Sequence, residues 1–402
     1  MTTRVLQLDL AAAPSDVAGL EAYDGARVLV RYGSHVVGEV YVPVREGTVT
    51  AASVSAALNG DQAARARLSA IIVEDHVIRP DAAVSPSWSV VVCTRDRPEM
   101  LRRCIESLIV ELDGTGEIIV VDNAPATDAT ERIAERYPVR YVRENAPGLN
   151  RARALGARTS NGDIVIYTDD DTVAEPGWVR ALVSEFGGAR VGGATGLTMP
   201  LELETEAQEL FERYGGFSKG FFRQEYDVTK ISPSRAGAVG SGASMAFRRD
   251  LILSLGLFDV ELDLGTASRT GGDTYALYRL LAEGYRIVYT PAALNWHQHR
   301  REHDELHTTM AGYGTGLYAF LTRALVEDHE VPALRVGMSW FRKHHLRELA
   351  RAIARRPNHL SIAMVMAEIR GTLVAPIAYL SSRRAERARA SENVGVSGKG
   401  AA

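Results

Sequence analysis

The sequence predicts an α/β protein with a small α+β domain before the core and a helical region after it. From residue 87 onward, short apolar strands alternate with amphipathic helices, which is the pattern of a mainly parallel sheet covered on both faces. Before residue 85 the pattern is a hairpin and a helix, and after Glu302 it is predominantly helical. The 402 residues are 46% hydrophobic, which is enough for a large core and suggests about two to three domains.

Four parts of the chain are expected: an N-terminal α+β accessory domain at residues 1–84, the α/β core at 85–300, a helical region at 301–390 and a disordered tail at 391–402. In the first part, residues 27–32 and 35–42 read as a hairpin, and an Ala-rich helix follows at 54–70. Residues 80–86 make a plausible linker because prolines bracket them. This part holds no catalytic constellation, so we expect it to dock or to scaffold.

The core strands are expected, in chain order, at residues 88–93, 117–122, 139–142, 162–168, 191–198, 243–247 and 286–289. Helices lie between them, the first opened by Pro98, where a proline suits the first turn. The periodicity weakens between residues 217 and 240, where Gly, Ser, Lys and Arg accumulate. A stretch of this length in a compact domain is more often a functional loop than filler.

The C-terminal helical region is basic and partly very apolar. Residues 331–389 hold 12 Lys and Arg against 3 Asp and Glu, although the whole chain has a net charge of -4. Residues 360–380 are the most apolar stretch, but Glu368, Arg370 and Pro376 inside it argue against a membrane-spanning helix. Two interpretations stay open: a peripheral surface for an anionic membrane carrying lipid-linked acceptors, and a basic face within a homo-oligomer.

The composition also indicates in which compartment the protein works and which kinds of partner it binds. Cys93 and Cys104 are the two cysteines, and two thiols in a chain this long are no disulfide framework. The first ten residues are too short and too interrupted by acid for a signal peptide. We therefore expect a cytoplasmic protein, peripheral on the inner face of the membrane if the basic region binds lipid. A nucleic-acid partner is not expected, because the basic patch lacks interleaved aromatic residues.

Three consecutive carboxylates, Asp169, Asp170 and Asp171, follow the fourth strand directly. They repel one another, so a chain keeps them where positive charge offsets the repulsion, and the end of such a strand is a usual ligand site. An Asp-x-Asp pair there suits a hard divalent cation carrying phosphate oxygens. The alternative is an acidic turn that caps the next helix.

Polar residues also follow the first two strands, at the edge where an open α/β sheet exposes its ligand crevice. Thr94, Arg95 and Arg97 follow the first strand, and Asp122 and Asn123 end the second. A carboxylate there can accept a hydrogen bond from a ribose hydroxyl or a base N–H, while Thr and Arg can hold a base or a phosphate edge. Turn and capping chemistry is the alternative, and it is the better interpretation of Asn123 by itself.

Two further candidates lie late in the core. Asp273 opens a predicted helix, and in a crevice with a metal one carboxylate can act as the general base for a hydroxyl nucleophile. Capping of that helix is the alternative. His297 lies in a polar cluster just beyond the last expected strand, where an imidazole could ligate a metal or contact a diphosphate.

Together these residues carry a resemblance, which covers roughly half of the chain. Residues 88–300 resemble a family 2 glycosyltransferase of the GT-A fold, a nucleotide-diphospho-sugar transferase fold related to the Rossmann fold. The matching pieces occur in the expected order at residues 90–97, 120–123, 148–153, 168–171, 242–249, 256–259 and 272–287. Each piece is weakly specific by itself, whereas seven in this order form a strong signal.

The resemblance implies an inverting transfer of a sugar from a nucleotide-diphosphate donor to a glycan, lipid-linked or small-molecule acceptor, as in the synthesis of cell-envelope polysaccharide. It implies Asp122 at the nucleoside with Thr94 and Arg95 nearby. It also implies Arg153 and Asp169 at the uridine or ribose. Asp171 would ligate Mg²⁺ or Mn²⁺, Asp273 would be the base, and His297 would contact the metal or diphosphate. Arg97, Asn123 and Asp170 are candidate donor contacts by their position beside these residues.

The chain departs from the family pattern at two of these positions. Gly272 stands where an acid commonly precedes the catalytic Asp, and Ala154 stands where the third motif usually offers an amide. The Gln-x-x-Arg-Trp of processive relatives is absent, which favours single addition. A nucleotidyltransferase is the closest enzymatic alternative, although residues 94–98 lack the Gly-rich loop typical of that class. A non-catalytic protein that binds a nucleotide sugar also remains open.

Overall fold

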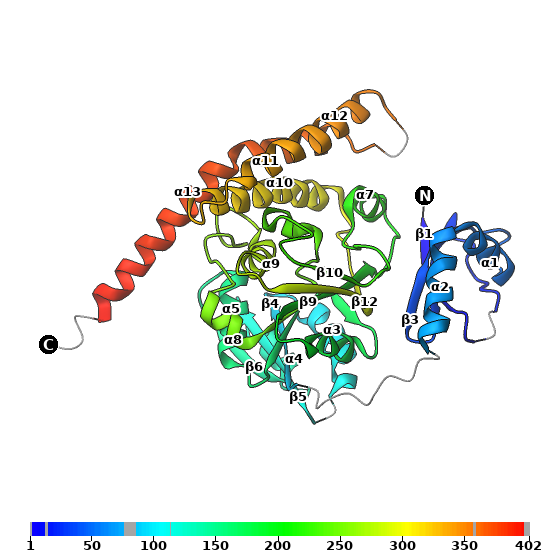
Figure 1. Cartoon of the computed structure of the whole chain (residues 1–402), viewed down its shortest axis with the longest axis horizontal. Coiled ribbons are helices and arrows are strands. Elements are labelled where there is room, and N and C mark those ends of the chain that lie inside the picture. Colours follow the sequence, from blue (N-terminus) through cyan, green and yellow to red (C-terminus); the bar gives the residue numbers. More distant parts are fainter. Residues whose placement is uncertain (1, 13–14, 76–85, 113, 357–358, 398–402) are drawn as a thin grey trace.

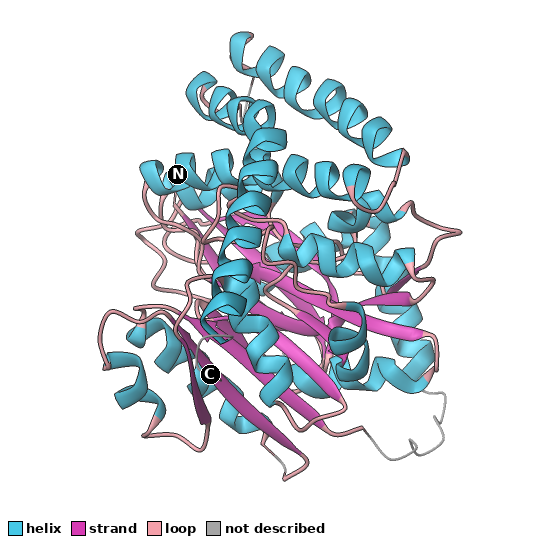
Figure 2. Ribbon diagram, turned by 90° about the vertical axis from the view of Figure 1, so that its left-hand side faces the viewer, coloured by secondary structure: helices cyan, strands magenta, loops and turns pink. Residues whose placement is uncertain are grey.

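The computed structural model describes residues 2–397 apart from 13–14, 76–85, 113 and 357–358. Figure 1 shows a central α/β body, a small N-terminal domain beside it, and a layer of long helices along one side of the body. In the view of Figure 2, helices cover both faces of the sheet, and the long helices are stacked beyond one end of it. The α/β core between an α+β domain and a helical region confirms the predicted fold class.

One half of the central sheet consists of parallel strands in the order β7-β4-β5-β6. These strands are β4 (Trp88–Thr94), β5 (Gly116–Asn123), β6 (Arg140–Glu144) and β7 (Ile164–Asp169). Every residue of β4 is buried, and its alternate side chains enter two different cores. The carboxyl ends of β4, β5 and β7 therefore meet at one edge of the sheet.

The other half of the sheet is mixed. Strand β11 (Met245–Arg248) runs antiparallel to both neighbours, β7 and β9 (Val191–Pro200). Beyond β9 lies β12 (Arg286–His297), which pairs with β10 (Gln224–Tyr226) and with β8 (Thr172–Ala174). The stretch between residues 217 and 240, where the periodicity weakens, thus contains one short strand and the 3₁₀ turn η3 (Pro233–Ala238).

Strand β12 is longer than the sequence predicted. The expected strand ended at Tyr289, but β12 continues parallel to β9 after a register shift between Thr290 and Leu294, and it ends at His297. Pro291 lies in the shift, where its missing N–H removes no regular ladder bond. The His297 side chain is therefore fixed by a strand of the sheet and not by a loop beyond it.

Helices pack on the two faces of this sheet around separate cores. They are α3 (Pro98–Leu108), α4 (Ala129–Ala134), α5 (Leu149–Thr159), α6 (Trp178–Val183), α8 (Arg249–Leu255) and α9 (Gly272–Ala282). Short 3₁₀ turns continue α3 and α6 as η1 (Ile109–Glu111) and η2 (Ser184–Gly187). One core joins Val91 and Phe247 to helix α9, and the other joins Val90 and Val92 to Trp178 of α6.

The N-terminal domain contains the predicted hairpin, β2 (Gly25–Tyr32) with β3 (His35–Pro43), and an additional strand β1 (Thr3–Asp9) parallel to β2. Two helices, α1 (Ala51–Gly60) and α2 (Gln62–Asp75), replace the single helix predicted at 54–70. Asp61 separates them, because its carboxylate accepts hydrogen bonds from the first N–H groups of α2. Of the predicted linker 80–86, all but Pro86 lies outside the described residues.

The helical region runs from α10 (His303–Val326) through α11 (Pro332–Trp340), η4 (Phe341–His345), α12 (Leu346–Ile353) and α13 (Ile362–Ser397). Residues 391–397 belong to the stretch expected to be a disordered tail, and in the structure α13 continues through them to Ser397. Its Arg- and Ala-rich sequence after Ser382 favours helix. Within α13, residues 362–389 are long and apolar enough to cross a membrane by length and composition, with a mean hydropathy of 1.4, although 44% of the apolar window is buried against the protein.

Candidate functional site

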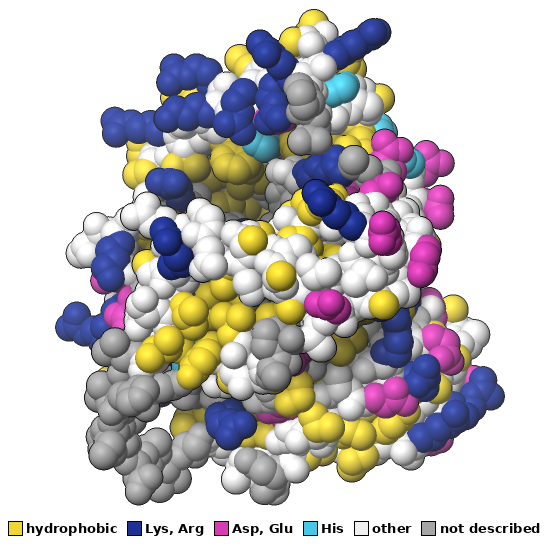
Figure 3. All heavy atoms as spheres, turned by 90° about the vertical axis from the view of Figure 1, so that its right-hand side faces the viewer, with side chains coloured by type: hydrophobic (Ala, Val, Ile, Leu, Met, Phe, Trp, Pro, Cys, Tyr) yellow, Lys and Arg dark blue, Asp and Glu magenta, His cyan; other side chains and the backbone are white. Residues whose placement is uncertain are grey.

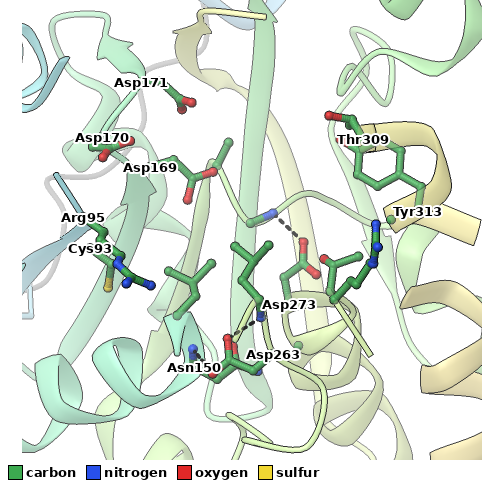
Figure 4. Close-up of a pocket in the computed structure, with 18 of the residues that line it drawn as sticks. Cys93, Arg95, Asn150, Asp169, Asp170, Asp171, Asp263, Asp273, Thr309 and Tyr313 are labelled. Carbon is green, nitrogen blue, oxygen red and sulfur yellow. Dashed lines mark hydrogen bonds between the residues drawn. The ribbon is translucent and has the colours of Figure 1, made fainter. Parts of the chain in front are cut away.

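A cavity of about 620 Å³ lies between the carboxyl edge of the sheet and helix α10. The loop after β4 and the three Asp residues after β7 form one wall, and Asp273 faces them across the cavity (Figure 4). Thr309 and Tyr313 of α10 line the side away from the sheet. Ten of the eleven residues predicted for the site line this cavity: Thr94, Arg95, Arg97, Asn123, Arg153, Asp169, Asp170, Asp171, Asp273 and His297.

Asp170 is directed to the loop after β4. Its Oδ2 accepts a hydrogen bond of 2.7 Å from Thr94 Oγ1, and its Oδ1 lies 3.2 Å from Arg97 Nη1. Burial, with the neighbouring charge of Asp171, raises the pKa of Asp170 to about 6. The carboxylate thus holds Thr94 and Arg97 in place, and both of its oxygens already have partners in the chain.

Asp171 is surrounded by positive or polarisable groups. Its Oδ1 lies 3.2 Å from His297 Nε2, and its Oδ2 lies 3.4 Å from Arg97 Nη1 and 3.7 Å from Arg300 Nη2. Burial acts to raise the pKa of Asp171, but His297, Arg300 and Arg97 outweigh it and hold the pKa at about 2. Asp171 is therefore ionised throughout the physiological range.

A divalent cation fits beside this carboxylate. Asp169, Asp171 and His297 each offer a ligand atom, and these atoms lie within 4.8 Å of one another. Asp171 Oδ1 is buried and makes no hydrogen bond with the described part of the chain. Two carboxylates and one imidazole are a donor set that suits Mn²⁺ or Mg²⁺ completed by oxygen ligands.

A chain of side chains leads from His297 to the N-terminal domain. His297 Nδ1 lies 3.0 Å from His299 Nδ1, and His299 Nε2 lies 2.9 Å from Glu212 Oε2. Glu212 Oε1 in turn lies 2.9 Å from Arg27 Nη2 on β2. Glu212 belongs to α7 (Glu206–Gly215), whose first turn is fixed by a capping box between Thr205 and Gln208.

This chain of contacts fixes the tautomers of both imidazoles. A carboxylate accepts, so His299 donates from Nε2 to Glu212, and its Nδ1 is left as an acceptor. His297 then donates from Nδ1 to His299, so Nε2 is the nitrogen that faces Asp171: as N–H it donates to that carboxylate, and as a lone pair it can ligate a metal. Burial lowers the pKa of His299, which keeps its ring neutral as this arrangement requires. The lone pair is thereby oriented toward the position of a metal.

Asp273 lies in the first turn of α9, with each carboxylate oxygen held by one backbone N–H. Gly242 N donates to Oδ2 at 3.0 Å and Thr274 N donates to Oδ1 at 2.8 Å. A Cβ at position 242 would lie 2.8 Å from Arg153 Nη2 and 3.0 Å from Asp273 Oδ2, so glycine lets both approach the same backbone. On its other side Arg153 lies 3.6 Å from Asp169 Oδ1. The second lone pairs of Asp273 are left toward the cavity.

Two predicted donor contacts have other partners in the structure. Asp122 is completely buried and does not line the cavity; its Oδ2 accepts from the Tyr141 hydroxyl at 2.9 Å. Asn123 lines the cavity, but its amide donates to Ala146 O and accepts from Gly148 N, each at 2.8 Å. Asn123 therefore stabilises a turn, as its alternative interpretation expected. A contact with the donor is not needed to explain this residue.

The structure also explains the departure at Gly272. A Cβ at this position would lie 2.0 Å from Asn150 Nδ2, whose amide donates to the backbone oxygens of Asp259 and Leu262. Asn150 occupies the space that a side chain at 272 would need, so an acid cannot be accommodated there. No local pattern predicts this exchange, because the two positions are far apart along the chain.

Sequence reasoning missed other residues of the cavity. Asp263 is buried, and its Oδ2 accepts from Asn150 N at the start of α5, where a negative charge suits the helix dipole. Burial raises the pKa of Asp263. Tyr313 comes from α10, outside the expected core, and it could not be assigned because no local motif precedes it. Lys219 does not line the cavity, but it lies in the loop that was predicted to be functional and near enough for the charge of Asp273 to act on it; burial lowers the pKa of Lys219 although Asp273 opposes the shift.

Comparisons with known proteins agree with this geometry. Residues 89–255 match the family model described as Glycosyl transferase family 2. A glucosyl-dolichyl phosphate glucuronosyltransferase of Haloferax volcanii is 26% identical over 183 residues, which are 42% of this chain and 55% of the relative. A pre-mycofactocin glycosyltransferase of Mycobacterium tuberculosis is 25% identical over 255 residues, 62% of this chain and 51% of the relative. The chain spans about half the length of the curated relatives it matches.

A solved structure gives the corresponding comparison in three dimensions. The mannosyltransferase PcManGT from Pyrobaculum calidifontis, in complex with GDP-Man and Mn²⁺, superposes with a TM-score of 0.50. The superposition covers 77% of this chain and 93% of that chain at 17% sequence identity. A likeness of this kind shows that the two chains share their fold.

Proposed function

Because the chain belongs to glycosyl transferase family 2 and has the GT-A fold, we propose that it transfers a sugar from a nucleotide-diphosphate donor to a hydroxyl group of an acceptor. The observation that carries this proposal is one cavity with two opposed carboxylate groups. Asp171, ionised and beside His297, lies on one side, and Asp273 lies on the other. Such a cavity can hold a leaving diphosphate at one wall and deprotonate a nucleophile at the other.

Donor binding falls to the residues at the strand ends. Arg95 and Arg97 line the cavity next to the three Asp residues and supply positive charge for a diphosphate. Asp122 Oδ1 is buried and has no hydrogen-bond partner among the described residues, so an N–H of the base or a ribose hydroxyl would satisfy it. Asp122 does not line the cavity, so a donor would reach this oxygen only if the wall at Asn123 moves.

Asp169, Asp171 and His297 would hold the divalent metal. When bound, Mg²⁺ or Mn²⁺ offsets the charge that develops on the leaving diphosphate. Other residues of the chain position the groups around the metal and the diphosphate: Asp170 fixes Arg97, and His299 orients His297. Metal dependence of the transfer is part of the proposal.

Asp273 is the proposed general base. As the acceptor oxygen attacks the anomeric carbon, its proton moves to a carboxylate oxygen of Asp273, and the bond from carbon to the diphosphate oxygen breaks. One displacement from the face opposite the leaving group inverts the anomeric configuration. Gly242 N and Thr274 N hold the carboxylate without protonating it, which keeps it available as an acceptor.

A donor screen tests the function. UDP-, GDP- and dTDP-sugars are offered with Mn²⁺ and with EDTA, and thermal stabilisation and hydrolysis are measured. We expect one nucleotide series to raise Tm in a metal-dependent way and to release the nucleoside diphosphate. Release of pyrophosphate would instead indicate a nucleotidyltransferase, and binding without any turnover in the presence of acceptors would indicate a non-catalytic binder.

We further propose that the acceptor is lipid-linked and that the helical region binds the anionic inner face of a membrane. On α13, the exposed residues Ile362, Met366, Leu373, Ile377 and Leu380 recur at helical spacing and form one apolar stripe. Leu334 and Met338 of α11 are also exposed. A contiguous patch of exposed apolar side chains commonly marks a surface that binds a membrane or another protein.

Positive charge surrounds this apolar surface. Lys and Arg side chains gather over the upper part of the view in Figure 3, where hydrophobic side chains lie among them. The exposed basic residues of the region include Arg335, Arg342, Lys343, Arg347, Arg355, Arg356, Arg370 and Arg384. An apolar stripe with flanking cations complements an anionic lipid surface. Because α10 lines the cavity and packs against α13, a bound membrane would lie close to the acceptor side of the site.

A further inference from the structure

A second group of metal-ligating side chains lies outside the proposed reaction site. The His–Glu site consists of His344 and His345 of η4, Glu368 of α13 and Tyr214 of α7. Glu368 Oε1 lies 3.6 Å from His344 Nε2, and Glu368 Oε2 lies 3.6 Å from His345 Nδ1. Ligand atoms of a tetrahedral ion with bonds of about 2.1 Å are roughly 3.4 Å apart, so both pairs are near the spacing that an ion requires.

His345 carries the strongest indication of a missing partner. Its side chain is completely buried, and its Nδ1 makes no hydrogen bond with the described residues. Its Nε2 lies 3.0 Å from Thr372 Oγ1. When Nε2 donates to this hydroxyl, the lone pair of Nδ1 faces a carboxylate oxygen of Glu368. In that tautomer two acceptors face each other in a buried place, and either a proton on Nδ1 or a metal ion between them would remove the repulsion. The separation of 3.6 Å is too long for an N–H···O hydrogen bond, which favours the ion.

The surrounding hydrogen bonds do not supply this cation. The Tyr214 hydroxyl lies 2.7 Å from His344 Nε2 and also contacts a Glu368 oxygen. It has one proton, so it can donate to one of the two. Thr372 meanwhile fixes the orientation of the His345 ring, the role that an outer hydrogen bond has at a ligating histidine.

The backbone brings the two adjacent histidines to one side. η4 is a π-helical turn, a rare distortion that frequently occurs at functional sites. Aromatic rings enclose both imidazoles: Trp340 stacks on His344 at 4.6 Å between ring centroids, and Tyr318 stacks on His345 at 6.0 Å. These rings exclude water, as the apolar shell around a bound metal does.

We propose that the His–Glu site binds one Zn²⁺ ion, with two imidazoles and one carboxylate as ligands and Tyr214 beside the fourth position. Neutral imidazole and carboxylate are ordinary zinc ligands. The ion would join η4 to α13 next to α7, the helix that also presents Glu212 to His299. Its role would be to fix the helical region to the core, and it is separate from the metal of the transfer reaction.

The test uses the full-length chain without a polyhistidine tag, in an Asp171→Asn background that disables the reaction site. After Zn²⁺ loading and dialysis, metal analysis should find about one Zn²⁺ per chain. His345→Gln or Glu368→Gln added to this background should lose the ion, whereas His307→Gln, at an exposed position of α10, should retain it. Bound Co²⁺ should show the visible spectrum of a tetrahedral site in the retaining proteins.

A second measurement guards against variants that do not fold. The Tm of the Asp171→Asn protein should rise when Zn²⁺ replaces EDTA, because an ion that binds the folded state stabilises it. If the Asp171→Asn protein holds no Zn²⁺ and its Tm does not change, the site is an ordinary buried His–Glu network and the proposal is wrong. Retention of Zn²⁺ by folded His345→Gln protein would equally overturn it.

Discussion

Asp171 has surroundings unlike those of an ordinary surface acid. It is buried, and its pKa is held at about 2 by His297, Arg300 and Arg97 against the effect of burial. Asp170, one residue earlier, has a pKa of about 6 and faces Thr94. Adjacent carboxylates with opposite shifts have different tasks, which supports Asp171 as the metal ligand and Asp170 as a structural residue.

The first prediction concerns this division of tasks. Asp171→Asn should weaken Mn²⁺-dependent donor binding at least about tenfold, because a charged ligand of the ion is lost. Titration calorimetry with and without Mn²⁺ measures the effect. Asp163→Asn, before β7 and hydrogen-bonded to Ser87, is a matched control that should bind as the wild type does. Donor binding that is indifferent to EDTA in the wild type would contradict the metal assignment.

The second prediction concerns the thiols. Burial raises the pKa of Cys93 to about 12 and raises that of Cys104 as well. A raised pKa leaves the thiol protonated and unreactive until the pH approaches that value, so neither cysteine should react with a thiol reagent at pH 8 in the folded protein. Both should react in denaturant. Rapid labelling of the native chain would show that the cavity wall at Cys93 opens.

For single residues, the sequence predicted most of the side chains that line the cavity but not the contacts that these side chains make. Seven of the ten predicted residues that line the cavity follow from the rule that strand ends of a parallel sheet meet at one edge, which needs no side-chain geometry. Arg153 was predicted only from the family resemblance, Asp273 from the start of a helix and His297 from its place after the last expected strand. The amide of Asn123 and the clash of a Cβ at 272 with Asn150 depend on contacts between distant parts of the chain. Such contacts are not encoded in local patterns, so they could be found only in the structure.

The elements that carry the site are β12 and α7. Because β12 continues to His297 and α7 presents Glu212, a strand and a helix orient the imidazole that faces Asp171. The sequence placed His297 after a strand that ended earlier, since Pro291 interrupts the apolar pattern. Arg27 on β2 completes the series, so the N-terminal domain contacts the site through side chains.

The third prediction tests this series. Glu212→Gln removes the charge that fixes the His299 tautomer, and outer partners of a metal ligand typically contribute 10–100-fold to affinity. We expect the affinity for Mn²⁺ to fall about tenfold while the fold is kept. Glu206→Gln, on the exposed first turn of the same helix, is the control. The effect is measured by Mn²⁺ titration with circular dichroism as the check on folding.

If Glu212 acts by positioning His299, a variant of its other partner should have the same effect on Mn²⁺ affinity. Arg27→Met should weaken Mn²⁺ binding in the same direction, because Arg27 holds the second oxygen of Glu212. An unchanged Mn²⁺ affinity in both variants would mean that the series is structural only.

The whole molecule has an acidic core, an apolar and basic helical layer, and a small domain that packs on the sheet. Leu29 and Val36 of the N-terminal domain share a core cluster with Trp296 of β12. The fold class followed from periodicity, because strands and helices leave different repeats in the sequence. The length of α13 could not be predicted from periodicity, because Pro376 and the charges of residues 383–389 resemble the end of a helix.

The fourth prediction concerns the helical layer. The full chain should co-sediment with vesicles that contain anionic phosphatidylglycerol and should be released by salt, because each Lys or Arg near such a surface contributes about 1 kcal/mol. Leu373→Glu with Ile377→Glu should abolish binding, whereas Val110→Glu, an equally exposed position in η1, should not. Self-association through the stripe, with no binding to vesicles, would contradict the membrane proposal and favour a homo-oligomer.

The most direct test of the central claim is the sugar-transfer rate of Asp273→Asn with its preferred donor. We expect kcat to fall about 10²- to 10⁴-fold, while the Kd for the donor with Mn²⁺ changes less than about twofold, because a base acts on the acceptor and not on the donor. Asp304→Asn, at the exposed start of α10, should transfer at the wild-type rate. An unchanged rate for Asp273→Asn would contradict the assignment of the base and, with it, the proposed reaction at this cavity.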